Sequence, residues 1–244
     1  MKKIALVTGA SSGLGREFVR QLGACAGLDE IWAIARRADR LEALQGLSPC
    51  PVRPIPLDLT RRESIDSLKG MLAAEQPVIC VLVGAAGLGR IGPTASIPDA
   101  DNDAMIDLNC RAAVDVTAAC LPYLRRGSRV LEICSTAGFQ PMPCLNVYAA
   151  TKAFLLSYTK ALHHELLPRG IHVTAVCPYW VKDTEFIPQA RQTGAAGFRH
   201  FPLASRSESV VRRALRDSRL NLWVSTPGRC APSTGSPPSS SPTP

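Results

Sequence analysis

Tyr148 and Lys152 are the two residues whose types and spacing most directly offer chemistry. Residues four apart on a helix share one face, so a helix through this stretch places the phenol beside the ammonium. A cation about 4 Å away, at an effective dielectric constant of about 20, would favour the ionised phenol by roughly 4 kcal/mol, or about three pKa units. The pair therefore predicts a tyrosine that exchanges protons near neutral pH, although helix surfaces also carry these residues at this spacing by chance.

A glycine-rich turn near the N-terminus offers a second kind of chemistry. The apolar run 4–7 predicts a buried strand, the turn runs from Thr8 to Gly15, and a helical pattern follows over about 16–22. This order points backbone N–H groups and a helix dipole at a pyrophosphate. The glycine spacing is Gly-x-x-x-Gly-x-Gly. The alternative is an ordinary glycine-rich strand-to-helix turn. The position of the turn directly after the first strand of an α/β pattern favours the phosphate-binding interpretation over this alternative.

Apolar strands alternate with helical segments along the rest of the chain. We expect strands at about residues 3–7, 30–35, 52–56, 78–83, 128–134, 171–176 and 221–225. We expect helices at about residues 13–23, 39–46, 61–75, 100–121, 146–167 and 205–217. This alternation predicts an α/β fold, a doubly wound parallel sheet in one Rossmann-like domain, with about seven strands and helices on both faces. Asp39 and Glu42 resemble a capping box at the start of the second helix.

Length and composition set the domain organisation. The 244 residues are 46% hydrophobic and 20% charged, enough for one domain with a substantial core. We expect the domain to cover residues 1–226. Residues 227–244 are almost entirely Pro, Ser, Thr and Gly, so we expect a disordered tail there.

Several classes of protein are disfavoured by the same composition. No stretch is apolar enough to span a bilayer and no signal-peptide cleavage pattern is present, so we expect a cytoplasmic protein without a membrane partner. The formal charge of +8 is dispersed and aromatic residues make up only 5%, which disfavours a nucleic-acid partner. The nine cysteines show no Cys-x-x-Cys or metal-binding spacing, so we expect reduced thiols and no metal.

Taken together, these motifs resemble the short-chain dehydrogenase/reductase family over about residues 2–226. The turn Thr8 to Gly15 is similar to the family's cofactor turn, and Asp58-Leu59 follows the third strand, where the family contacts adenine. Ser135 ends the fifth strand, thirteen residues before Tyr148. After the sixth strand, the run from Pro178 to Thr184 resembles the segment that closes over a nicotinamide.

The resemblance implies an NAD(P)-dependent enzyme that interconverts a carbonyl and a secondary alcohol by hydride transfer. Tyr148 would act as general acid/base, and Lys152 would lower its pKa and hold the ribose hydroxyls. Ser135 would hydrogen-bond the substrate oxygen, and Asn109 would hold a water that links Lys152 to solvent. The cofactor-binding residues implied are Gly9, Ser11, Ser12, Gly13, Leu14, Gly15, Arg36, Asp58, Leu59, Ala85, Ala86, Gly87, Tyr148, Lys152, Pro178, Val181 and Thr184. The alternative is a catalytically silent NADP(H)-binding or regulatory protein.

The end of the second strand favours NADP(H) over NAD(H). A carboxylate there would bind the ribose 2′-hydroxyl of NAD and repel a 2′-phosphate. The strand at 31–35 instead ends without an acid, and Arg36 and Arg37 follow. A guanidinium pairs well with a 2′-phosphate, so we expect NADP(H) as the preferred cofactor, with NAD(H) as the alternative. Another alternative is that Arg36 stacks over the adenine.

Three further expectations concern departures, substrate and assembly. Ala85 stands where the family has an Asn that braces the central strands, and Tyr179 replaces a glycine. The segment 182–202 should form a lid whose four apolar side chains favour an apolar carbonyl or alcohol substrate, unless they only pack the lid on the body; they are Phe186, Ile187, Phe198 and Phe201. The resemblance implies a homo-oligomer, a dimer or tetramer, built through the helices at 100–121 and 146–167.

Overall fold

One parallel sheet forms the centre of the molecule. The computed structural model describes residues 1–25, 27–191 and 203–227. Within these residues, seven strands pair in parallel in the order β3-β2-β1-β4-β5-β6-β7. The strands are β1 (Lys3–Thr8), β2 (Glu30–Ala35), β3 (Val52–Pro56), β4 (Val78–Gly84), β5 (Leu124–Ile133), β6 (His172–Val176) and β7 (Val224–Ser225). The order reverses between β1 and β4, which is where ligands bind in open sheets of this kind.

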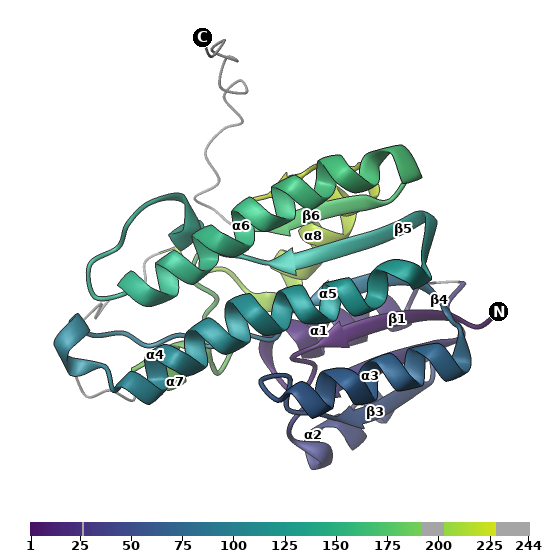
Figure 1. Cartoon of the computed structure of the whole chain (residues 1–244), viewed down its shortest axis with the longest axis horizontal. Coiled ribbons are helices and arrows are strands. Elements are labelled where there is room, and N and C mark those ends of the chain that lie inside the picture. The colour runs from purple at the N-terminus through teal and green to yellow at the C-terminus, as the bar shows by residue number, and fades with distance from the viewer. Residues whose placement is uncertain (26, 192–202, 228–244) are drawn as a thin grey trace, which may run out of the picture.

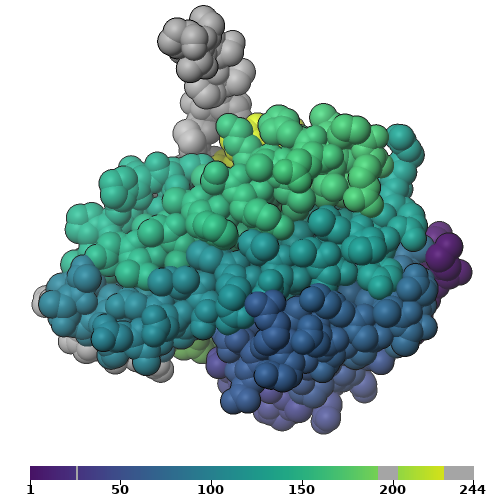
Figure 2. All heavy atoms as spheres, in the orientation of Figure 1, coloured from purple at the N-terminus to yellow at the C-terminus, as the bar shows by residue number. Residues whose placement is uncertain are grey.

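Helices cover both faces of the sheet (Figure 1). One face carries α1 (Gly13–Gly23), α2 (Ala38–Glu42) and α8 (Ser207–Arg219). The other carries α3 (Arg62–Glu75), α5 (Ala113–Cys120) and α6 (Asn146–Leu166), and this face is turned toward the viewer in Figure 2. The remaining helices are α4 (Asp99–Ile106) and α7 (Phe186–Ala190), and short helical turns occur at Gln45–Leu47, Thr94–Ser96, Leu121–Tyr123, Thr136–Phe139 and Leu167–Arg169.

The apolar runs of the central strands explain this three-layer arrangement. Successive side chains of a strand point to opposite faces. In β1, Ile4 and Leu6 join the core beneath α3, α5 and α6, whereas Ala5 and Val7 join the core beneath α1, α2 and α8. All four are fully buried, so a strand that is apolar at every position needs helices on both sides. The predicted fold class is confirmed.

Two details of the helices differ from the sequence-based expectation. The helix expected over 100–121 consists of α4 and α5 joined by a π-helical turn at Asp107–Ala112, which no periodicity signalled. The second helix begins at Ala38 with Arg37 as its N-cap residue, and no side chain caps it. Asp39 therefore lies in the first turn, where its charge favours the helix dipole, and the predicted capping box is wrong.

Thr8 supplies the brace that Ala85 lacks. Its hydroxyl oxygen accepts hydrogen bonds from the backbone N–H groups of Ala85 and Ala86, both at 3.1 Å, and its hydroxyl donates to the Val83 carbonyl at 3.4 Å. The ends of β1 and β4 are thus joined by one side chain from β1. The missing Asn does not leave these backbone groups unpaired.

The described residues extend to 227, so the predicted domain boundary at 226 stays a prediction, and the predicted tail from 228 onward lies outside them. Within the described part of the chain, every helix is too short or too polar to cross a bilayer.

Glu132 is an acid buried inside the sheet. It is 1% exposed, and one carboxyl oxygen accepts a hydrogen bond from Thr117 at 2.8 Å. The other has no hydrogen-bond partner among the described residues. It fits because the neighbouring residue of β4 is Gly84, where an added Cβ would lie 2.0 Å from Oε2. Burial raises the pKa of Glu132 to about 7, against the opposing effects of Thr117 and Lys152.

This raised pKa predicts a stability that falls with pH. The unfolded chain loses the Glu132 proton at lower pH than the folded chain, so the free energy of unfolding should decrease from about pH 4.5 to about pH 7. Glu132→Gln cannot ionise, so above pH 7 it should exceed wild type by on the order of 3 kcal/mol. Denaturant unfolding at several pH values measures this. Glu42→Gln, at an exposed position, is the control; a difference between Glu132→Gln and wild type that does not change with pH would contradict the account.

Candidate active site

The carboxyl ends of the central strands open into one cleft of about 740 Å³. Parallel strands end at the same edge of a sheet, so the loops that follow them meet there. The cleft is lined by Ser135 and by every residue predicted to bind the cofactor, from the glycine turn to Thr184. Asn109 is the one predicted site residue that does not line it.

The glycine turn lies tightly against the end of β4. Gly9 has a φ of +64°, and a Cβ there would lie 2.6 Å from the Ala85 carbonyl oxygen. A Cβ on Gly15 would lie 2.2 Å from the Gly9 carbonyl oxygen. At the start of α1, Ser12 caps the helix without a side-chain hydrogen bond, and the first turn contains no acid. The turn thus presents backbone N–H groups and a helix N-terminus to the cleft, which fits a pyrophosphate.

Ser135, Tyr148 and Lys152 lie together at the other end of the cleft. Ser135 follows β5, and its hydroxyl oxygen accepts a hydrogen bond from the Ala137 N–H at 3.1 Å. Tyr148 lies in the first turn of α6. Lys152 follows one turn later, with Nζ 5.8 Å from the centre of the Tyr148 ring. Its ammonium donates a hydrogen bond to the Ile133 carbonyl at 2.7 Å. The predicted shared helix face is therefore present.

The electrostatics of Tyr148 differ from the sequence-based expectation. Burial raises the pKa of its phenol well above the ordinary value of 10, and the hydrogen bond with the Ser135 side chain only partly opposes this. Burial also lowers the pKa of Lys152. The expected fall of the phenol pKa to near neutrality is therefore wrong for this structure. A partly hydrated ion pair would lower the pKa of the phenol, but here both groups are buried and the ammonium is bound to a backbone carbonyl.

Asn109 connects two parts of the site instead of facing the cleft. It is fully buried in the π-helical turn. Its Oδ1 accepts from the Leu88 N–H at 2.9 Å, and its Nδ2 donates to the Leu88 carbonyl at 2.8 Å and to Thr151 Oγ1 at 3.0 Å. Both amide hydrogens are therefore used by the protein. Asn109 fixes the loop after β4 to helix α6, next to Lys152.

The far end of the cleft carries Asp58 and the arginines after β2. Burial disfavours the Asp58 carboxylate, but hydrogen bonds from the Thr60 side chain and N–H, with Arg36 and Arg61 nearby, hold its pKa below the ordinary value. Arg36 is exposed and lines the cleft. Arg37 lines it too and donates two hydrogen bonds to the Ser11 hydroxyl, at 3.1 and 3.3 Å.

A family model described as short chain dehydrogenase matches residues 3–194. The chain belongs to the short-chain dehydrogenase/reductase family. It is an enzyme of that family, as the sequence predicted.

Relatives and solved structures of the family agree with this assignment. The NADP-dependent 3-hydroxy acid dehydrogenase YdfG of Salmonella typhi is 34% identical over 186 residues, 75% of this chain and 74% of that enzyme. An uncharacterized oxidoreductase of Staphylococcus epidermidis is 28% identical over 223 residues, 91% of this chain and 94% of that protein. A short-chain dehydrogenase from Sphingobium yanoikuyae, solved in complex with NADPH, is 28% identical with a TM-score of 0.80, and the match covers 93% of this chain and 87% of that one.

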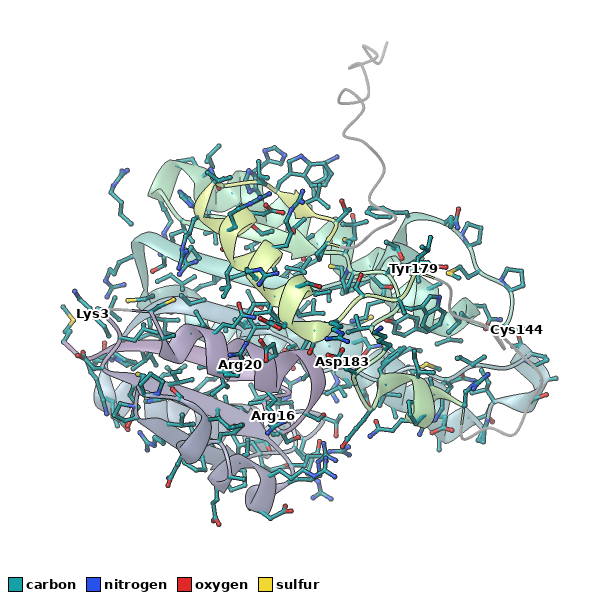
Figure 3. All side chains as sticks on the ribbon, turned by 180° about the vertical axis from the view of Figure 1, so that it is seen from behind. Lys3, Arg16, Arg20, Cys144, Tyr179 and Asp183 are labelled. Carbon is teal, nitrogen blue, oxygen red and sulfur yellow. The ribbon has the colours of Figure 1, made fainter. Side chains whose placement is uncertain are left out.

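Two residues of the expected lid segment also line the cleft, and sequence reasoning did not single out one of them, Glu185. Glu185 and Phe186 line it, and the Phe186 ring lies 5.3 Å from the Tyr148 ring. No motif signalled Glu185, although it lies in the expected lid segment 182–202, whereas Phe186 was expected there as an apolar lid side chain. Tyr179 and Trp180 also line the cleft, and Figure 3 labels Tyr179 and Asp183, both on the segment that follows β6.

The hydrogen bonds of Asn109 predict a cost for its removal. Asn109→Ala leaves the Leu88 N–H and carbonyl without these partners, so it should lower the free energy of unfolding by about 1–3 kcal/mol. Asn102→Ala is the matched control, because the side-chain amide oxygen of Asn102 is buried without a partner among the described residues. This substitution should lower the free energy of unfolding by only about 0.5 kcal/mol. Equal costs in denaturant unfolding would contradict the bracing role.

Proposed function

We propose that this enzyme is an NADP(H)-dependent oxidoreductase that interconverts a carbonyl and a secondary alcohol. One observation carries the proposal: a single cleft joins the glycine turn and Arg36 at one end to Ser135, Tyr148 and Lys152 at the other. A dinucleotide needs the first set, and proton exchange with a substrate oxygen needs the second.

The cofactor choice rests on the end of β2. Ala35 ends the strand and Arg36 follows, so the position offers a guanidinium in place of an acid. The exposed Arg36 is free to meet a 2′-phosphate at the cleft wall. The names of the Salmonella and Sphingobium relatives, which use or contain NADP(H), support the same choice. When bound, the nicotinamide supplies or accepts the hydride.

Tyr148 is the proton donor in the direction of carbonyl reduction. Burial raises its pKa, so the phenol is protonated at neutral pH and holds the proton that the developing alkoxide needs. The Ser135 hydroxyl hydrogen-bonds the same oxygen and orients it. Lys152, held by the Ile133 carbonyl, places a positive charge beside this end of the cleft and favours the phenolate left after transfer. Asn109 acts as a positioning residue through Thr151 and the Leu88 loop.

The substrate end of the cleft is apolar. Six large apolar side chains line it: Leu88, Phe139, Met142, Leu145, Trp180 and Phe186. An apolar ketone, aldehyde or alcohol fits this lining because it buries its hydrocarbon part there and leaves its oxygen to Ser135 and Tyr148. Of the lid residues expected from sequence, Phe198 and Phe201 lie outside the described residues.

Assembly and location stay predictions. Phe154 on α6 stacks on Tyr158 with ring centres 6.5 Å apart and is 47% exposed. An exposed aromatic on this helix supports the proposed homo-oligomer, a dimer or tetramer, through the helices at 100–121 and 146–167. A cytoplasmic location likewise stays a proposal, and it rests on the sequence composition.

The first experiment measures NADPH oxidation with a panel of apolar ketones, aldehydes and quinones. Tyr148→Phe keeps the ring but removes the proton, so kcat should fall by roughly a hundredfold or more while NADPH affinity changes little. Wild-type turnover should stay level between about pH 6 and 8, since the phenol keeps its proton there. Turnover that survives Tyr148→Phe would contradict the assigned role. NADPH binding without turnover on any carbonyl would favour the silent-binder alternative.

A second experiment tests the cofactor choice. Arg36→Ala should weaken NADPH binding by roughly ten- to a hundredfold, because a charged hydrogen bond to the 2′-phosphate is lost, and should change NADH binding little. Calorimetric titration gives both dissociation constants. Arg61→Ala is the matched control, since Arg61 also acts on Asp58 but does not line the cleft. An unchanged NADPH affinity in Arg36→Ala would overturn the preference for NADP(H).

A further inference from the structure

The residues 181–185, called here the crossing segment, run over the glycine turn. The Thr184 side chain lies beside Gly13, where an added Cβ would meet it at 3.3 Å. Val181 pairs with Ser205 in a short bridge, and the Lys182 N–H donates to the Ser205 carbonyl at 3.0 Å. Asp183 accepts hydrogen bonds from the Ser207 N–H and hydroxyl at the start of α8, in the region seen in Figure 3. The segment is thus fixed on the α8 side of the cleft.

The last residue of the crossing segment reaches the opposite wall. Glu185 forms an ion pair with Arg37 at 3.1 Å and a second with Arg40. The guanidinium of Arg37 therefore bonds the Ser11 hydroxyl and the Glu185 carboxylate at once. The hydrogen bond from Arg40 is the largest cause of a lowered pKa at Glu185, so this side chain is an anion at neutral pH.

One of the two arginines held by Glu185, Arg37, lies at the cleft wall where the proposed cofactor carries its extra charge. Arg37 lines the cleft directly after Arg36, and Glu185 lines it as well. Carboxylates and phosphates bind guanidinium groups in the same way, through paired charge-assisted hydrogen bonds. A carboxylate and a 2′-phosphate at this wall would therefore compete for the same donors.

We propose that Glu185, held also by Arg40, occupies Arg37 in place of a 2′-phosphate and thereby sets how strongly the enzyme distinguishes NADP(H) from NAD(H); this rests on the proposed function. Binding of NADP(H) exchanges the Glu185 carboxylate on Arg37 for the phosphate. NAD(H) has no 2′-phosphate to exchange, so the ion pairs persist. Glu185 is thus a specificity-determining residue that weakens NADP(H) binding relative to NAD(H).

The test compares the dissociation constants of NADPH and NADH for wild type and Glu185→Gln by calorimetric titration. The Gln side chain is of equal size and carries no charge. NADPH should bind roughly three- to tenfold more tightly to the variant, as expected for freeing the half-exposed Arg37, whereas NADH affinity should change less than about twofold. The gain should shrink at high salt, because these charges are exposed to screening.

Asp183→Asn is the matched control. It removes one charge from the same segment, and Asp183 contacts Ser207 instead of the arginines. Its NADPH-to-NADH ratio should stay at the wild-type value. An equal gain in both variants would mean that general charge, and not competition for Arg37, is responsible, and would overturn the proposal.

Two other outcomes have distinct meanings. An unchanged or weakened NADPH affinity in Glu185→Gln, with wild type binding NADPH normally, overturns the role of Glu185 and leaves the proposed function intact. Failure of folded wild type to bind either cofactor overturns the proposed function itself, and with it the inference. Circular dichroism on each variant establishes that it is folded.

Discussion

The close approach of the β1–α1 turn to the end of β4 is the constraint on which the site depends. Gly9 lies against the Ala85 carbonyl, Gly15 lies against Gly9, and any side chain at either position would separate them. Thr8 then joins the same two strands through its hydroxyl. Because the turn is held this closely, the N-terminus of α1 faces the strand ends, and the cleft extends without interruption toward Ser135 and Tyr148.

Burial dominates the chemistry at the other end of the cleft. Tyr148 and Lys152 are each less than a tenth exposed, and Glu132 is buried in β5, the strand that leads to Ser135. Removal from water disfavours every charged form, which raises the pKa of Tyr148 and Glu132 and lowers that of Lys152. The site thus holds a protonated phenol. Hydrogen bonds partly offset the cost of burying these polar groups: Lys152 bonds the Ile133 carbonyl, and Tyr148 bonds the Ser135 hydroxyl.

The sequence predicts the fold and most of the site because both rest on local patterns. Apolar runs place the strands, and Gly9, Gly15 and the Tyr148-Lys152 spacing mark the two ends of the cleft. What it misses depends on contacts between distant segments. Asn109 turns from the cleft because a π-helical turn directs it to Leu88, and Glu185 reaches Arg37 across 148 residues of chain. The predicted fall in the Tyr148 pKa is wrong because burial, unlike spacing, is not visible in a local motif.

The measurement that tests the central claim most directly follows a labelled hydride. Folded enzyme is incubated with a panel of apolar carbonyls and NADPH that carries deuterium at the transferable position of the nicotinamide, and the masses of the alcohol products are measured by mass spectrometry against those formed with unlabelled NADPH. The account predicts that the alcohol formed by wild type is one mass unit heavier than the alcohol formed with unlabelled NADPH. NADPH that binds but leaves every carbonyl unlabelled would contradict it.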